Sequence, residues 1–187
     1  MLLSKTSGDQ VILVDRNDQP LGTAPKLEAH QKALCHRAFS VFVIRQSLAG
    51  IEVLLQQRQH DKYHSRGLWT NTCCSHPHPG DKTQEAAERR LVEEMGIHLT
   101  LRPIGVFHYE ALLDTGLTEH EVDHVLVGSY DGQNFTINPN EVADYRWITI
   151  EALQADLEKQ PKSYTPWLLP ALHILIAFFK DDSHAAF

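Results

Sequence analysis

The chain has 187 residues, of which 42% are hydrophobic and 22% are charged, and its formal net charge at pH 7 is −7. This is the composition of a globular protein, and it excludes collagen-like and intrinsically disordered chains. The net negative charge does not favour general binding to nucleic acid or to an acidic membrane surface. The three cysteines are an odd number and argue against a disulfide framework, so we expect a reducing, cytoplasmic location.

Six segments are rich in branched and aromatic residues and are predicted to be strands. In chain order they are residues 11–14, 38–44, 52–57, 106–111, 122–130 and 144–148. Helical patterns cover residues 83–95 and 150–159, and a third lies at the C-terminus. Because strands outnumber helices and do not alternate strictly with them, we expect an α/β (α+β) fold, a mixed sheet with helices packed against it and not a βα barrel.

The helix at residues 83–95 carries its own boundary signals. Asp81 is the predicted N-cap, with Gln84 three residues further on as in a capping box, and Gly96 is the predicted stop. The acidic end of this helix, which includes Glu94, suits a helix that holds Mg²⁺ against phosphate oxygens. The alternative interpretation is a salt-bridged surface helix.

The most apolar stretch is residues 167–179. It is too short to span a bilayer and is predicted to be a buried C-terminal helix. Thr165 is expected to cap this helix and Pro166 to occupy its first turn. The N-terminus has no apolar core of the secretory type, so no signal peptide is expected.

A loop rich in proline, residues 69–80, holds Cys74, Ser75 and His76 in succession. One interpretation is that His76 binds a metal while a neighbouring cysteine carries out proton or nucleophile chemistry. The other is that Cys73 and Cys74 form a buried structural thiol pair beside a surface loop.

Residues 119–123 place three carboxylates at alternate positions. In a strand, Glu119, Glu121 and Asp123 point to one face because the side-chain period is 2. Such a cluster repels itself unless a positive charge, for example a divalent cation, lies among its members. The alternative is a solvated edge strand whose charges prevent edge-to-edge pairing.

Histidine is the commonest metal ligand, and His30 and His36 stand six residues apart,. This spacing belongs to neither a helical nor a zinc-finger site. The remaining histidines are interpreted mostly as surface or packing residues: His60, His64, His78, His98, His108, His120, His124, His173 and His184.

Together these stretches resemble the type I isopentenyl-diphosphate isomerases, which are enzymes of the Nudix superfamily. The resemblance runs from about residue 11 to the segment at residue 167, and its most specific part is the Trp-Thr-Asn-x-x-Cys-x-His-Pro run that starts at Trp69. It implies a single Nudix-type domain over residues 1–187, with an N-terminal extension and a C-terminal helix. In such a domain a mixed β-sheet is sandwiched between helices.

The resemblance also implies an activity, the interconversion of isopentenyl and dimethylallyl diphosphate in isoprenoid biosynthesis. The reaction proceeds by protonation and deprotonation through a tertiary carbocation. The catalytic residues implied are Cys74, Glu121, Tyr109 and Trp167. The implied partner is therefore a small-molecule substrate, with no nucleic acid or membrane, and the chain is expected to be a monomer or weak homodimer.

Two metal sites follow from the same resemblance. A divalent ion (Mn, Mg or Zn) is expected on His30, His36, His76, Glu119 and Glu121. A Mg²⁺ that accompanies the substrate diphosphate is expected at Glu94 and the backbone carbonyl of Cys74. The basic residues expected to contact the diphosphate are Lys26, Arg58, Lys62 and Arg90.

Two alternatives remain open from the sequence. One is a Nudix hydrolase acting on a nucleoside diphosphate derivative, and the other is a non-catalytic metal-binding domain. The hydrolase helix carries glutamate where this chain has Arg90, which argues against pyrophosphate hydrolysis. A metal-binding domain would need neither Cys74 nor Trp167.

Overall fold

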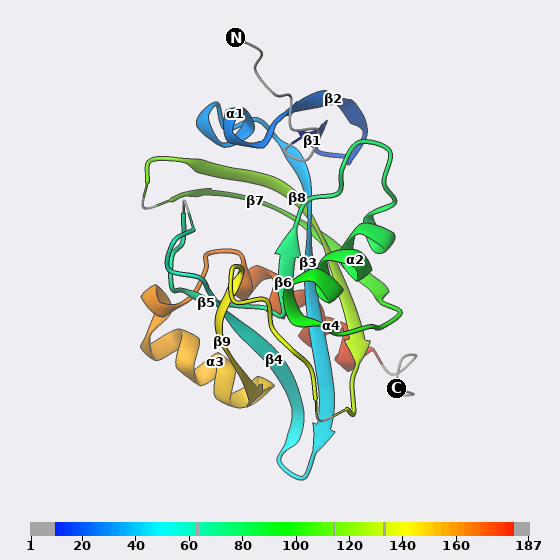
Figure 1. Cartoon of the computed structure of the whole chain (residues 1–187), viewed down its shortest axis with the longest axis vertical. Helices are drawn as coiled ribbons and strands as arrows, with labels where there is room; N and C mark the ends of the chain where they lie inside the picture. Colours follow the sequence, from blue (N-terminus) through cyan, green and yellow to red (C-terminus); the bar gives the residue numbers. More distant parts are fainter. Residues whose placement is uncertain (1–9, 63, 114, 133, 182–187) are drawn as a thin grey trace.

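A mixed β-sheet forms the centre of the structure (Figure 1). The computed structural model describes residues 10–62, 64–113, 115–132 and 134–181. Within these ranges the sheet has nine strands: β1 (Gln10–Val14), β2 (Pro20–Pro25), β3 (His36–Ser47), β4 (Gly50–Arg58), β5 (Trp69–Thr70), β6 (Cys73–Ser75), β7 (Arg102–Leu112), β8 (Thr118–Ser129) and β9 (Val142–Thr149). All six predicted strands are confirmed.

Strand β3 organises this sheet. It pairs in parallel with β8, from His36 opposite Glu121 to Ile44 opposite Ser129. It also pairs in antiparallel fashion with β1, β4 and β6. Strand β7 extends the sheet beyond β8, and β9 extends it beyond β4. The first residue of β3, His36, therefore lies beside Glu121 near the start of β8, and both strands begin at the same end of the sheet.

Helices cover both faces of the sheet (Figure 1). Helix α2 (Thr83–Met95) packs on the face that receives Val41 and Val43 of β3. Helices α3 (Ile150–Lys159) and α4 (Leu168–Lys180) pack on the face that receives Phe42 and Ile44. The alternation follows from the side-chain period of 2, and it confirms the predicted α/β (α+β) architecture. The short helices α1 (Lys26–Gln31) and η1 (Pro161–Ser163) complete the described elements.

The predicted cap of α2 is wrong at one end and confirmed at the other. Lys82 is the N-cap, without a side-chain cap bond. Asp81 instead accepts hydrogen bonds from the backbone N–H of His78 and from the Arg89 guanidinium, so its carboxylate does not cap the helix. Gly96 ends the helix in the left-handed conformation, with φ +66°.

The C-terminal helix is confirmed as α4, and its apolar side is buried against the sheet. None of the described helices combines the length and the apolar character needed to cross a membrane. Thr165 does not cap α4, because Trp167 occupies the N-cap position and the Thr165 hydroxyl donates to Thr70 Oγ1 at 2.9 Å. The hydroxyl therefore joins the segment before α4 to β5 and does not cap the helix.

Strands β2, β5 and β6 were not predicted. The last two are only two and three residues long and lie within the proline-rich loop at residues 69–80. Their residues become strands because β4 and β3 provide hydrogen-bonding partners at those positions. Local sequence carries little information about such short pairings.

We expect Gly96→Ala to destabilise the fold more than Gly116→Ala does. Both glycines have positive φ, which costs about 1–2 kcal/mol for other residues,. A Cβ at Gly96 would also lie 2.6 Å from the Thr136 carbonyl oxygen, whereas a Cβ at Gly116 meets nothing within 4 Å. Urea titration should give a loss of about 2–4 kcal/mol for Gly96→Ala and about 1 kcal/mol for Gly116→Ala. Equal losses would show that the contact with Thr136 is irrelevant.

Candidate active site and metal centre

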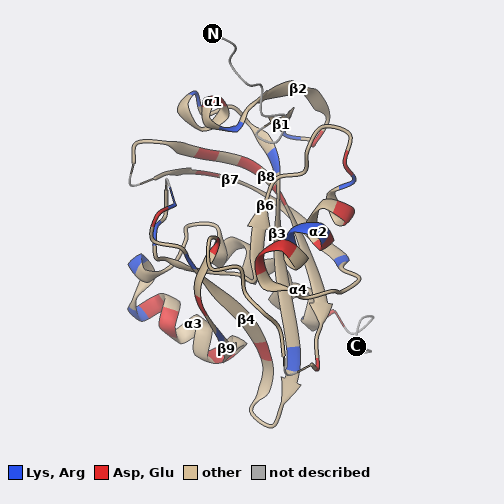
Figure 2. Ribbon diagram, viewed as in Figure 1, with Lys and Arg blue, Asp and Glu red and all other residues tan. Residues whose placement is uncertain are grey.

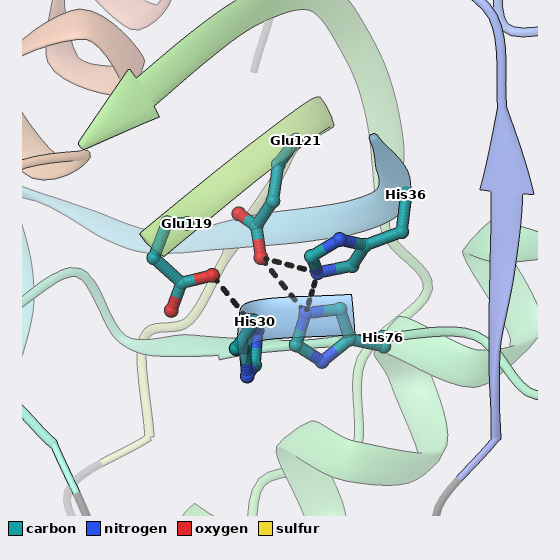
Figure 3. Close-up of side chains that lie close together, drawn as sticks. All are labelled: His30, His36, His76, Glu119 and Glu121. Atoms are coloured by element: carbon teal, nitrogen blue, oxygen red, sulfur yellow. Dashed lines mark hydrogen bonds and ion pairs between the residues drawn. The ribbon is translucent and has the colours of Figure 1, made fainter. Parts of the chain in front are cut away.

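Five side chains converge at the end of the sheet where β3 and β8 begin (Figure 3). Helix α1 contributes one, β3 one, the loop after β6 one and β8 two. One ligand atom from each of the five lies within 4.8 Å of all the others, and four of the five residues are buried. The residues are His30, His36, His76, Glu119 and Glu121. The structure thus brings together the whole predicted set.

The contacts within this cluster link imidazoles to carboxylates. His30 Nε2 lies 3.0 Å from Glu119 Oε2. His36 Nε2 and His76 Nε2 lie 3.3 and 2.8 Å from the same atom, Glu121 Oε1. The two imidazole nitrogens are themselves only 3.2 Å apart. Three potential ligand atoms therefore face one small volume.

The chemistry of these donors fits a divalent cation. His36 Nδ1–H donates to the Leu34 carbonyl at 2.8 Å, which leaves a lone pair on Nε2 facing the cluster,. Without a metal, a proton on His36 Nε2 can pair with Glu121, whereas a cation would bind both imidazole nitrogens and the carboxylate at once. A set of imidazole nitrogens and carboxylate oxygens suits Zn²⁺, Mn²⁺ or a similar ion.

The three carboxylates of β8 are buried, with exposed fractions of 3% for Glu119, 4% for Glu121 and 1% for Asp123. Strand β8 is paired on both sides, so the interpretation as a solvated edge strand is wrong. Burial raises the pKa of Asp123, and the nearby Glu121 charge adds to that effect. Its Oδ2 accepts a hydrogen bond of 2.8 Å from Ser40 Oγ.

Glu121 is the carboxylate with the most partners in this group. Burial by itself would raise its pKa, but the hydrogen bond and positive charge of His36 outweigh burial and lower the pKa to about 2. The Tyr109 hydroxyl donates to Glu121 Oε2 at 2.5 Å. This contact follows from the register, because Tyr109 of β7 stands directly opposite Glu121.

The adjacent cysteines face opposite sides of the sheet. In the pairing of β6 with β3, Cys73 stands opposite Val41 and Cys74 opposite Ser40. Cys73 is therefore fully buried among the residues that pack on α2. Cys74 lines a pocket together with the β8 carboxylates. The interpretation of both as a structural thiol pair applies to Cys73 alone.

Burial raises the pKa of Cys74 to about 12, although the Arg58 charge acts in the opposite direction. The thiol therefore keeps its proton at neutral pH. Tyr109 and Trp167 line the same pocket, so the four residues predicted to be catalytic are brought together.

Thr70 fixes the indole of Trp167, a role that the sequence analysis missed. Trp167 Nε1–H donates to Thr70 Oγ1 at 3.0 Å. The Thr70 hydroxyl in turn donates to Asn71 Oδ1 at 2.9 Å and lies 3.9 Å from Cys74 Sγ. The only sequence signal was that Thr70 and Asn71 belong to the specific run starting at Trp69.

His64 was also missed, because it was interpreted as a surface or packing residue. It is buried, lines the pocket, and its Nε2 lies 3.5 Å from Glu119 Oε1. Its ring makes an edge contact with Trp167, at 6.3 Å between centroids. Burial lowers the pKa of His64 to about 3, so the ring is neutral. No signal in the sequence distinguishes it from the neighbouring His60.

The predicted diphosphate-binding residues line a second hollow that shares Cys74 and Ser75 with the first pocket. Acidic residues lie among them, and Figure 2 shows both charge types side by side on α2. Glu94 pairs with Arg90 at 2.6 Å and accepts from Gln56 Nε2 at 2.8 Å. The four basic residues of this hollow are Lys26, Arg58, Lys62 and Arg90.

Comparisons with known proteins identify the family of the chain. Residues 35–168 match the NUDIX domain family. The chain is 44% identical, over 90% of its length and 87% of the relative, to isopentenyl-diphosphate Delta-isomerase 2 of Aromatoleum aromaticum. It is 46% identical, over 90% of its length and 94% of the relative, to isopentenyl-diphosphate Delta-isomerase of Photobacterium profundum.

Solved structures match the fold at lower identity. A Deinococcus radiodurans protein superimposes with a TM-score of 0.70 at 18% identity, covering 88% of this chain and 97% of that one. A MutT protein of Methanosarcina mazei superimposes with a TM-score of 0.57 at 18% identity, covering 78% and 95%. At this identity the likeness establishes the fold.

We expect His76→Ala and Glu119→Gln each to weaken metal binding by at least about tenfold, since even the loss of an outer-sphere partner has that effect. Each removes one donor from the five-residue cluster. Elemental analysis after dialysis against a dilute chelator would measure the metal retained. His78→Ala is the control, because its side chain is 44% exposed and lies outside the cluster. Unchanged metal in both cluster variants would refute the assignment of this centre.

Proposed function

We infer the activity from the family: the chain belongs to the isopentenyl-diphosphate Delta-isomerases, which are NUDIX-domain proteins, and it interconverts isopentenyl and dimethylallyl diphosphate. This is an isomerase reaction that supplies isoprenoid biosynthesis. It moves a double bond by adding a proton at one carbon and removing a proton at another.

One observation carries the assignment of the reaction to this pocket. The side chain of Cys74 faces the same pocket as Glu121 and Trp167, whereas the adjacent Cys73 is packed beneath α2. A proton donor, a carboxylate and an aromatic ring in one largely buried space are the groups that such a proton shift needs. Neither simple metal binding nor phosphate hydrolysis needs the thiol.

We propose that Cys74 and Glu121 are the two proton-transfer residues. The carboxylate is held by Tyr109 and His36, and the thiol lies near the Thr70 hydroxyl. An alkene is a poor base, so a proton-bearing group must be fixed against one carbon while a base waits at another. Rigid placement of both groups on β6 and β8 supports these roles.

Trp167 is proposed to stabilise the positive charge of the intermediate through the face of its indole. A desolvated cation–π contact is worth about 2 kcal/mol. The ring is buried, and its N–H is anchored to Thr70, so its orientation does not need to be set during the reaction. The buried residues of the pocket lining would also limit the access of water, which captures carbocations,.

The metal centre is proposed to occupy the five-residue cluster of His30, His36, His76, Glu119 and Glu121. A divalent ion held there would offset the charge of the clustered carboxylates and would favour the ionised form of Glu121. Mg, Mn and Zn remain the candidate ions. The three histidines come from different segments of the chain, and they hold the carboxylates of β8 in one orientation.

The second hollow is proposed to bind the substrate diphosphate through Lys26, Arg58, Lys62 and Arg90. A Mg²⁺ accompanying the diphosphate would use Glu94 and the Cys74 carbonyl. Both Glu94 oxygens already accept hydrogen bonds, but a carboxylate oxygen has a second lone pair for a ligand,. These contacts orient the substrate and do not take part in proton transfer.

The cytoplasmic location stays a prediction, as does the oligomeric state, a monomer or weak homodimer. Three free cysteines support a reducing compartment,.

Product analysis with isopentenyl diphosphate tests the function directly. The chain should yield dimethylallyl diphosphate, and Cys74→Ala should reduce the rate by at least about 10²-fold, as removal of a proton-transfer group does. Release of phosphate without isomer would indicate a hydrolase, and neither product would indicate a metal-binding domain.

Cys73→Ala is the matched control for this variant. It leaves a small cavity beneath α2 and should lower stability by about 1 kcal/mol without a comparable loss of rate,. Exchanged phenotypes of the two cysteine variants would contradict the assignment of their faces.

A second prediction concerns the cation. Trp167→Phe keeps an aromatic face and should retain part of kcat, whereas Trp167→Leu keeps apolar bulk but loses the ring quadrupole and should lose about tenfold more. Thr70→Val should lower kcat less than Trp167→Leu, because it removes only the anchor of the indole. Equal kcat values for the Phe and Leu variants would mean that Trp167 only fills space.

A further inference from the structure

A second group of potential ligands lies outside the pocket. Sγ of Cys35, a ring nitrogen of His108 and one of His120 lie within 4.8 Å of one another. Cys35 Sγ is 3.5 Å from His108 Nε2, and the two imidazole rings meet edge to face at 5.1 Å between centroids. Cys35 and His120 are half-buried and His108 is exposed, so the group is reachable from solvent.

The sheet itself explains why these residues meet. Each immediately precedes a residue of the pocket or of its five-residue cluster: Cys35 comes before His36, His108 before Tyr109 and His120 before Glu121. Neighbouring residues of a strand point to opposite faces. The register that gathers the pocket residues on one face therefore gathers their predecessors on the other. The two clusters lie back to back across β3, β8 and β7.

The spacing of the donors matches a tetrahedral zinc-type site. With Zn–S of about 2.3 Å and Zn–N of about 2.0 Å, a sulfur and a nitrogen ligand stand about 3.5 Å apart. The Cys35–His108 distance already has this value. His120 Nδ1–H donates to the Ala33 carbonyl at 2.8 Å, which fixes the tautomer and leaves the Nε2 lone pair for a ligand,.

We propose that Cys35, His108 and His120 form a second metal site for a zinc-like cation, separate from the pocket centre. One thiolate and two imidazoles favour Zn²⁺, Co²⁺ or copper over Mg²⁺, Ca²⁺ or Mn²⁺. A fourth ligand can come from water or from Glu110, an exposed carboxylate directly opposite His120 in the register of β7 and β8. The bound ion ties the start of β3 to β7 and β8 behind the pocket.

Titration of the metal-free chain with Co²⁺ tests this site, because Co²⁺ bound to a thiolate shows a charge-transfer band in the near ultraviolet. The pocket cluster contains no sulfur ligand, so the band reports the second site alone. It should reach its plateau at one site per chain. Cys35→Ser should abolish it, while Cys74→Ser should retain it.

His108 is exposed, so its substitution should leave the packing of the core intact. His108→Ala and His120→Ala should each raise the Co²⁺ concentration at half-maximal absorbance by at least about tenfold, the loss that a removed outer-sphere partner already produces. Competition with a chromophoric chelator should count two Zn²⁺ per parent chain and one per Cys35→Ser chain.

Three results would overturn the proposal. The first is that no charge-transfer band forms although Co²⁺ has filled the pocket cluster. The second is that the band persists in the Cys35→Ser variant. The third is that the band is unchanged in both His108→Ala and His120→Ala. The last result would mean a simple thiol adduct. None of these readouts depends on isomerase activity, so failure of this proposal leaves the proposed function untouched.

Discussion

Three acidic side chains buried on one face of β8 are the constraint on which the site depends. Transferring a charged group from water into a protein costs several kcal/mol unless partners compensate. Here the charges of Glu119 and Glu121 are compensated by histidines from α1, β3 and the loop after β6. Asp123 accepts a hydrogen bond from Ser40, and its own pKa is raised. Segments far apart in the sequence must therefore meet at one point, which is also where a divalent cation is best accommodated.

The parallel pairing of β3 with β8 makes this meeting possible. It sets the start of both strands side by side, so His36 and Glu121 are neighbours by register and not by chance contact of loops. The same register sorts adjacent residues by face. Cys74 reaches the pocket while Cys73 packs beneath α2. A one-residue slip would exchange these faces and dismantle both clusters together.

Support for the pocket comes from contacts that individually carry no chemistry. The Thr70 hydroxyl joins the ends of β5 and α4 by accepting from Thr165 and Trp167. Because Thr70 is buried, loss of these hydrogen bonds would destabilise the fold: an unsatisfied buried polar group costs about 1–3 kcal/mol,. The aromatic wall is thus positioned by hydrogen bonds to a strand two residues long, and the rigidity of the pocket depends on that short strand.

The sequence by itself determined the six main strands and the helices α2 to α4, because periodicity is a local property. The candidate residues of the pocket came from the resemblance to the isomerase family, which is also read from the sequence alone. Only the tertiary structure decided how those residues meet: that Asp81 pairs with Arg89 instead of capping α2, that Thr165 contacts Thr70, and that His64 is buried beside Glu119. The physical reason is that burial and pairing partners come from segments distant along the chain, and a single strand or loop carries no record of what will lie across from it.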